Sequence, residues 1–236
     1  MEACTGGEPV GGRVGLLALC LGILFCIGCG SSSSSSNTGQ VRILEAAVGA
    51  PSVNILVDGM IMASNLGYGS ATAYLTVKSG SRHVQAVPVG GGSPVFDQSL
   101  SISASGHQTL LLTGSSSSIQ EAMLTDGGTT ATTGDGHVRV FNASSTMGPT
   151  DAYIVNAGTS IIGVQPITAN LAFGADTGYQ LVPTGNYEVF LTVPGTTSVN
   201  LGTGPLSLPT GTNPNQTVVV FDATAGGFAY ILFTDQ

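Results

Sequence analysis

The four cysteines are the side chains best suited to covalent chemistry, and all of them lie within the first 29 residues. Cys26 and Cys29 form a C-x-x-C spacing, which can indicate a redox pair or half of a metal site. No second pair with this spacing occurs, and no thioredoxin-like strand and helix pattern surrounds it. Redox chemistry is therefore the weaker interpretation of these thiols, and attachment of a lipid to one of them is the stronger.

An apolar run from Val14 to Ile27 precedes the last cysteine. It is shorter than the roughly 20 residues that cross a bilayer, and its length is typical of a signal peptide. Cys26-Ile27-Gly28-Cys29 resembles a bacterial lipobox, in which a small residue precedes the cysteine that takes a diacylglyceryl group. We predict a signal peptide over residues 1–28 and lipidation at Cys29, with an uncleaved anchor or an ordinary signal peptide as the alternatives.

A serine tract follows Cys29 almost directly and leads into a polar stretch that ends at Gln40. Such low-complexity sequence is typical of a linker, so residues 29–40 are predicted to be a flexible tether with a reach of roughly 17 Å. The predicted partner is the membrane, reached through the lipid anchor. The predicted location is the bacterial cell envelope, either periplasmic or at the outer membrane or cell surface.

The remaining candidates for acid–base or metal chemistry are three histidines: His83, His107 and His137. They are scattered along the chain, and no G-x-S-x-G, H-E-x-x-H, P-loop, G-x-G-x-x-G or EF-hand sequence accompanies them. We interpret them as exposed strand residues. The sequence therefore predicts no catalytic residue, no metal, no cofactor and no enzymatic activity.

Acidic residues near the middle of the chain leave one alternative open. Glu121, Asp126 and Asp135 lie close together in sequence and could supply oxygen ligands to Ca²⁺, which would stiffen the junction there. Asp-Gly sequences are, however, ordinary turn formers. The turn is the favoured interpretation of this stretch.

Composition points to an all-β protein that does not bind nucleic acid. From Val41 onward the chain has four basic and eleven acidic residues, and charged residues make up only 8% of the whole sequence. A phosphate backbone would be repelled by such a chain. The abundance of Gly, Ser, Thr and Val favours short strands with hydroxyl-rich solvent faces.

Short strand-like segments bounded by Gly, Ser or Pro recur through the first half after the tether. They span residues 41–46, 53–57, 60–64, 72–77, 82–89, 95–103, 107–113 and 119–125. Asp58-Gly59 separates the second from the third and is a strong hairpin signal. This number of strands in about 90 residues suits an immunoglobulin-like β-sandwich.

The pattern then repeats. VRILEAAVGAP (41–51) returns as VRVFNASSTMGP (138–149), and NLGYGSATAYLTVKSG (65–80) returns 105 residues later as NLAFGADTGYQLVPTG (170–185). We predict two tandem immunoglobulin-like sandwiches, 41–126 and 138–236, joined by a linker over 127–137, with one larger barrel as the alternative. Each is expected to own a separate core, and the candidates are Leu75, Val77, Leu110 and Leu112, then Val218, Val220, Ile231 and Phe233.

These motifs resemble the bacterial domain-of-unknown-function family 4397. The resemblance rests on the V-R-[IV] start, on VNILVDG, and on N-L-x-[YF]-G followed by a Tyr-led strand. It implies a β-sandwich and an envelope location, and it brings no functional residue because the family has no assigned activity. The second copy departs from the pattern where the hairpin Asp-Gly becomes Asn156-Ala157-Gly158.

Tyr68 and Phe173 are the only weak candidates for binding, because both copies keep an aromatic in the N-L-x-[YF]-G loop. The favoured interpretation is that each ring plugs the end of its own sandwich. The predicted function is a non-enzymatic scaffold, adhesion or interaction module that meets an envelope protein or glycan. The alternative is a carbohydrate-binding module, which exposure of two or more tyrosines on one flat face would favour.

Overall fold

The computed structural model describes residues 37–127, 133–211 and 214–236. Within these ranges every helix or strand is a β-strand, which confirms the predicted all-β fold class. None of the described residues forms a helix that could span a membrane. The signal peptide, Cys29 and most of the predicted tether lie outside the described residues.

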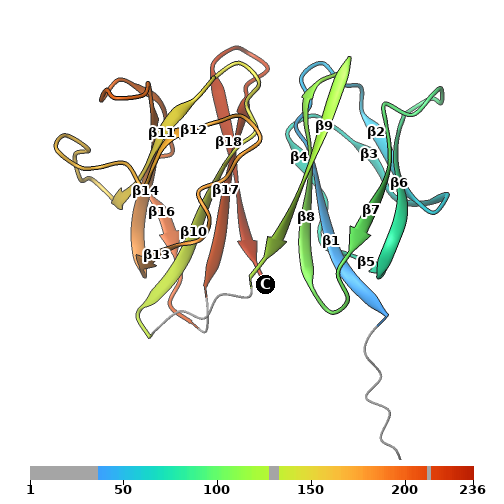
Figure 1. Cartoon of the computed structure of the whole chain (residues 1–236), viewed down its shortest axis with the longest axis horizontal. Coiled ribbons are helices and arrows are strands. Elements are labelled where there is room, and N and C mark those ends of the chain that lie inside the picture. Colours follow the sequence, from blue (N-terminus) through green and yellow to red (C-terminus); the bar gives the residue numbers. More distant parts are fainter. Residues whose placement is uncertain (1–36, 128–132, 212–213) are drawn as a thin grey trace, which may run out of the picture. The chain divides into compact units, whose positions relative to one another are not determined.

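The first repeat is a sandwich of two sheets (Figure 1). One sheet has the order β4 (Ser70–Ala71), β1 (Thr38–Glu45), β8 (His107–Ser115), β9 (Ser118–Asp126), and β5 (Leu75–Lys78) also pairs with β1. The other has the order β3 (Met60–Leu66), β2 (Val53–Val57), β6 (Gly80–Pro88), β7 (Phe96–Ile102). Strands β1 and β8 run parallel, and the other pairs are antiparallel.

The second repeat has the same plan. One sheet has the order β13 (Gln180–Pro183), β10 (Asp135–Asn142), β17 (Asn215–Asp222), β18 (Phe228–Asp235). The other has the order β12 (Thr168–Leu171), β11 (Thr150–Asn156), β14 (Gly185–Thr192), β15 (Val199–Gly202), and β16 (Leu206–Leu208) pairs with β14. The pair β10 and β17 is parallel, as β1 and β8 are. The two tandem immunoglobulin-like β-sandwiches of the sequence prediction are present.

Backbone conformation confirms the turn and repeat predictions. Asp58 and Gly59 both have positive φ, as a two-residue hairpin turn between β2 and β3 requires. Asn65 and Asn170 have φ of 54° and 53°, which marks them as equivalent positions of the two copies. Their N–H groups donate to the side chains of Asn54 and Asp151, at 3.0 and 2.9 Å.

Each sandwich has its own core. In the first, Val77, Leu110 and Leu112 are buried among side chains from both sheets, and Leu75 packs against them. In the second, Val218 and Val220 occupy the corresponding place. These six predicted core positions are confirmed.

A third buried cluster joins the repeats, and it corrects the prediction that each repeat buries its apolar side chains only within itself. We call it the seam. Its buried members are Leu44, Ala46, Leu111, Leu124, Phe141, Ala143, Val219, Phe221 and Phe233. Phe233 and the half-buried Ile231 were predicted for the second core but pack here. The predicted alternation along β18 is present, since Ile231 and Phe233 share one face of the sheet. That face meets the seam and not the second core, because both faces of this sheet are covered.

Residue alternation along β8 and β17 explains the seam. Leu110 and Leu112 point into the first core whereas Leu111 points into the seam, and Val218 and Val220 differ from Val219 in the same way. All eight residues of β17 are buried. Continuous apolar runs of this kind are typical of strands covered on both faces.

Candidate functional site

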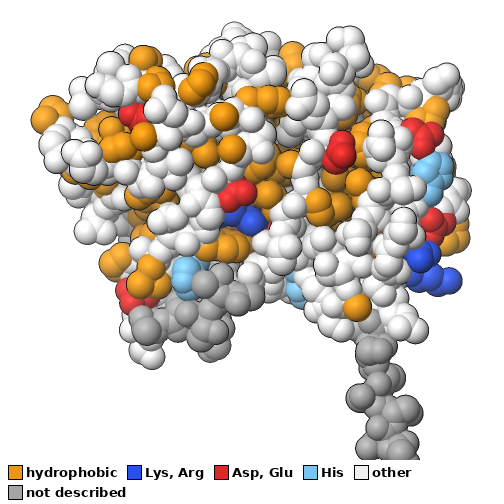
Figure 2. Space-filling view, viewed as in Figure 1, with side chains coloured by type: hydrophobic (Ala, Val, Ile, Leu, Met, Phe, Trp, Pro, Cys, Tyr) orange, Lys and Arg blue, Asp and Glu red, His pale blue; other side chains and the backbone are white. Residues whose placement is uncertain are grey.

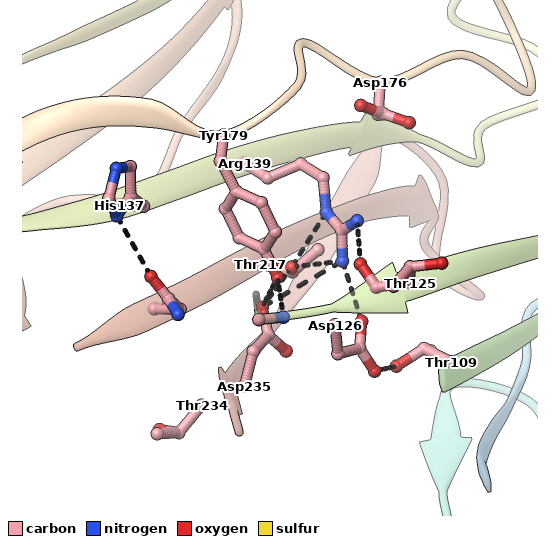
Figure 3. A network of polar contacts seen from close by, with 12 residues as sticks. Thr109, Thr125, Asp126, His137, Arg139, Asp176, Tyr179, Thr217, Thr234 and Asp235 are labelled. Atoms are coloured by element: carbon pink, nitrogen blue, oxygen red, sulfur yellow. Dashed lines mark hydrogen bonds and ion pairs between the residues drawn. The ribbon is translucent and has the colours of Figure 1, made fainter. Parts of the chain in front are cut away.

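A group of buried, hydrogen-bonded polar side chains lies beside the seam cluster, and Figure 3 shows the part of it around Arg139. It consists of four residue types, each supplied once by each repeat. The pairs are Arg42 and Arg139, Thr109 and Thr217, Tyr74 and Tyr179, and Asp126 and Asp235. The arginines are the second residues of the repeated V-R-[IV] motif, and the aspartates end β9 and β18.

Arg42 reaches from β1 into the second repeat. Its Nη2 donates to Thr109 Oγ1 at 2.7 Å within its own sheet and to Asp235 Oδ1 at 2.7 Å across the seam. Asp126 Oδ2, in its own repeat, is 3.5 Å away. Its guanidinium also lies over the ring of Phe233, 3.8 Å from the centroid. This position combines a charge-assisted hydrogen bond with a cation–π contact across the seam.

Arg139 makes the mirror contacts from β10. Its Nη2 donates to Asp126 Oδ1 at 2.8 Å, and its Nη1 donates to the carbonyl oxygen of Thr125 at 3.0 Å. Thr217 Oγ1 accepts from Nη2 at 2.9 Å within the second repeat. Each arginine therefore binds a threonine of its own repeat and a Thr-Asp end of the other.

Tyrosines complete the two halves of the network. Tyr74 Oη donates to Asp126 Oδ2 at 2.9 Å, and Tyr179 Oη donates to Asp235 Oδ2 at 2.7 Å. Burial, together with the charge of Asp235, raises the pKa of Tyr179 to about 12. Burial and the charge of Asp126 likewise raise the pKa of Tyr74. Both hydroxyls therefore stay protonated and act as hydrogen-bond donors.

The arrangement is suited to holding the repeats together and not to acting on a substrate. The arginine side chains are 6% exposed and the aspartate side chains 0%. Each buried charge has an opposite charge and further hydrogen bonds, which is the condition for tolerating ions in a protein interior. Removing one partner would leave an unpaired buried charge.

Another buried carboxyl lies on β1 without such a partner. Glu45 is 0% exposed, its Oε1 accepts from the N–H of Ala47 at 2.8 Å, and its Oε2 has no hydrogen-bond partner among the described residues. Burial raises the pKa of Glu45 to about 7. In the second repeat the same place is held by Asn142, whose Oδ1 accepts from the N–H of Ser144 two residues on.

Tyr68 bridges the repeats instead of plugging its own sandwich. Its hydroxyl donates to the carbonyl oxygen of Asp222 in the second repeat, and its ring meets Phe221 edge to face with centroids 5.9 Å apart. Phe173 is partly buried. The plug prediction is therefore wrong for Tyr68, because the loop end of the first repeat lies against β17.

Tyr68→Phe is expected to lower the free energy of unfolding of the whole chain by about 1 kcal/mol, since it removes one hydrogen bond and keeps the ring. The measurement is the urea midpoint, with Phe173→Leu as the comparison in the equivalent loop. A Tyr68→Phe variant with the wild-type midpoint would show that the hydroxyl contact across the seam contributes nothing.

The other predicted residues have separate positions. His83 lies on β6 beside Asp97, His107 begins β8, and His137 is buried on β10 with Nδ1 3.2 Å from Asn215 Oδ1. Within the described ranges no three His, Cys, Asp or Glu side chains gather as a metal-binding group. The carboxylate of Asp126 is bound to Arg42 and Arg139. It is therefore not free to act as the Ca²⁺ ligand that the calcium alternative requires.

Sequence reasoning missed the arginines and aspartates of the seam. A signal was present, because an arginine interrupts an apolar strand at the same place in both copies and both copies end in Thr-Asp. A charge repeated inside two buried strands indicates a paired charge nearby. What the sequence could not supply is that the pairing crosses from one copy to the other.

Fold and seam define a class of protein: tandem immunoglobulin-like β-sandwiches joined through a buried polar network. The chain belongs to the family described as a domain of unknown function, DUF4397, whose model matches residues 39–153 and 136–236. The two matches confirm the tandem arrangement inferred from the repeated motifs.

Other comparisons add little. No curated protein matches the chain significantly. Among solved structures, a family 41 carbohydrate-binding module from a streptococcal virulence factor, described for α-glucan recognition, aligns over 78% of this chain and 93% of its own. The identity is 12% and the TM-score 0.27, a level at which the similarity supports no inference about a ligand.

Proposed function

We propose that this chain is a non-enzymatic lipoprotein of the bacterial cell envelope that serves as a surface-tethered scaffold, adhesion or interaction module. The observation that carries the proposal is that the buried charged side chains bind one another and not a substrate. Arg42, Arg139, Asp126 and Asp235 are buried and bound to one another. A group that holds two sandwiches together is of use to a protein that presents surfaces, because it fixes the spacing of those surfaces.

The surface is consistent with recognition of a neutral or weakly charged partner. Charged residues are 8% of the sequence, and on the face shown in Figure 2 they form small, separate groups among neutral polar and hydrophobic side chains. The net charge of −8 would repel anionic partners, and with a neutral partner long-range charge attraction plays little part. Contact would instead depend on shape and hydrogen bonds.

Attachment to the membrane is proposed from the lipobox-like sequence that ends at Cys29. Cys29→Ala is expected to abolish incorporation of a labelled fatty acid and to leave the precursor uncleaved, because the thiol that takes the lipid is gone. Cys26→Ala is the matched control and should be lipidated normally. A Cys29→Ala protein that resists carbonate extraction would identify residues 14–27 as an uncleaved anchor and overturn the lipid attachment.

Binding to the envelope is tested with the lipidated chain. Crosslinking in intact cells followed by affinity purification should recover a specific envelope protein or glycan with the wild-type chain. A chain that turns over common ester, glycoside or peptide substrates, and recovers no envelope component, would contradict the proposal.

A further inference from the structure

An open groove lies at one end of the seam, between the repeats. Its volume is about 620 Å³, and its walls include Gln40, Tyr74 and His107 of the first repeat and Ile231, Phe233 and Gln236 of the second. This volume falls within the range of roughly 300–1,000 Å³ that is usual for small-molecule sites. The groove thus has suitable dimensions for a small ligand.

One pair of equivalent positions differs between the repeats, and the pair of the first repeat lines the groove. Gln40 pairs with His107 in β1 and β8, and His137 pairs with Asn215 in the same register of β10 and β17. His137 and Asn215 are 5% and 3% exposed and contact each other. Gln40 and His107 are only partly buried and face the groove. Two planar polar side chains are therefore left accessible in the first repeat alone.

The two tyrosines of the network also differ in how their hydroxyl and ring are used. Tyr179 Oη donates to Asp235 and also accepts the N–H of Gly127 at 3.1 Å. Tyr74 Oη donates to Asp126, and the Tyr74 ring lines the groove. It meets the His107 ring edge to face, with the two ring centroids 4.9 Å apart. A ligand hydroxyl can donate to Tyr74 as Gly127 does to Tyr179.

The chemistry of the walls selects a neutral, hydroxyl-rich ligand. Arg42 at the floor is balanced by Asp235 at 2.7 Å and Asp126 at 3.5 Å, so no unpaired charge is offered. Ile231 and the Tyr74 ring give apolar contact, while an amide, an imidazole and a phenol give hydrogen bonds. Sugars present both an apolar C–H face and neighbouring hydroxyls.

We propose that this groove binds a neutral saccharide. The inference rests on the proposed non-enzymatic binding function and adds to it the class of ligand and the place where it binds.

The test is titration calorimetry of the full chain with three neutral probes: maltotriose, cellotriose and triacetylchitotriose. At least one is expected to bind in the micromolar to millimolar range. His107→Ala and Gln40→Ala should each weaken it by about fivefold to tenfold, the effect of one lost hydrogen bond or ring contact. His83→Ala, a histidine on the far sheet of the first repeat, should bind as the wild type does.

Thermal stability separates a binding effect from a folding effect, since Gln40 and His107 are partly exposed and their alanine variants should melt with the wild type. Absence of binding for all three probes, or unchanged affinity in His107→Ala, would overturn the proposal. Capture of an envelope component that survives in His107→Ala would leave the proposed function intact and reject only the groove.

Discussion

Arg139→Met is expected to lower the free energy of unfolding of the entire chain by about 3–5 kcal/mol, the usual cost of removing one partner of a buried ion pair. The substitution keeps the length and most of the apolar stem of the side chain. It leaves Asp126, which is 0% exposed, without its 2.8 Å partner and with Arg42 at 3.5 Å. The measurement is the urea denaturation curve followed by circular dichroism.

Arg82→Met is the matched control. Arg82 pairs with Asp58 at 3.1 Å, but the two side chains are 27% and 39% exposed. A surface pair of this kind contributes about 0–1 kcal/mol. If Arg139→Met cost no more than Arg82→Met, the buried network would not be what holds the repeats together.

The second large effect is expected at Glu45 and depends on pH. The pKa of Glu45 is about 7 in the folded chain and 4.5 without burial. Between these two pH values the folded state holds a proton on Glu45 that the unfolded state has lost. Stability from this group is therefore complete below pH 4.5 and is lost as pH rises through 7. The predicted loss is about 3 kcal/mol.

Glu45→Gln should remove this pH dependence and stabilise the chain at pH 8 by about 2–3 kcal/mol, since an amide needs no proton to stay neutral. Asn142 shows that an amide suits the site: its Nδ2 donates to the carbonyl oxygens of Gly148 and Leu171, both at 3.2 Å. Glu121→Gln, exposed on β9, is the control and should keep the wild-type pH profile.

Urea midpoints between pH 4 and pH 9 provide the measurement. Lowered pKa values of Asp58, Asp97 and Asp222 affect stability only under more acidic conditions, because their stabilisation is lost as pH falls below about 4. Equal slopes for wild type and Glu45→Gln between pH 5 and pH 8 would mean that Glu45 is ionised in the folded chain.

Much of the fold follows from local sequence rules. Asp58-Gly59 forms the predicted hairpin because two consecutive residues can adopt positive φ there. The 105-residue offset places Asn65 and Asn170 at equivalent turns. Such features depend on residues close together in the chain, so the sequence contains what is needed to predict them.

The seam could not be predicted in the same way. Alternation along β18 shows that Ile231 and Phe233 share one face, but it does not say whether that face meets the partner sheet of the same repeat or the other repeat. Asp126 is predicted to lie in a turn because Asp-Gly sequences are ordinary turn formers, yet it ends β9 and its buried carboxylate accepts a hydrogen bond from Arg139. Contacts between residues of different repeats depend on how two finished sandwiches meet.

Differential scanning calorimetry of the full chain tests the central claim most directly, namely that the seam joins two sandwiches into one cooperative unit. The buried network and the seam cluster predict one transition whose calorimetric enthalpy equals its van't Hoff enthalpy. Two separable transitions, each unaffected by substitutions in the other repeat, would contradict it and restore the picture of independent domains on a linker.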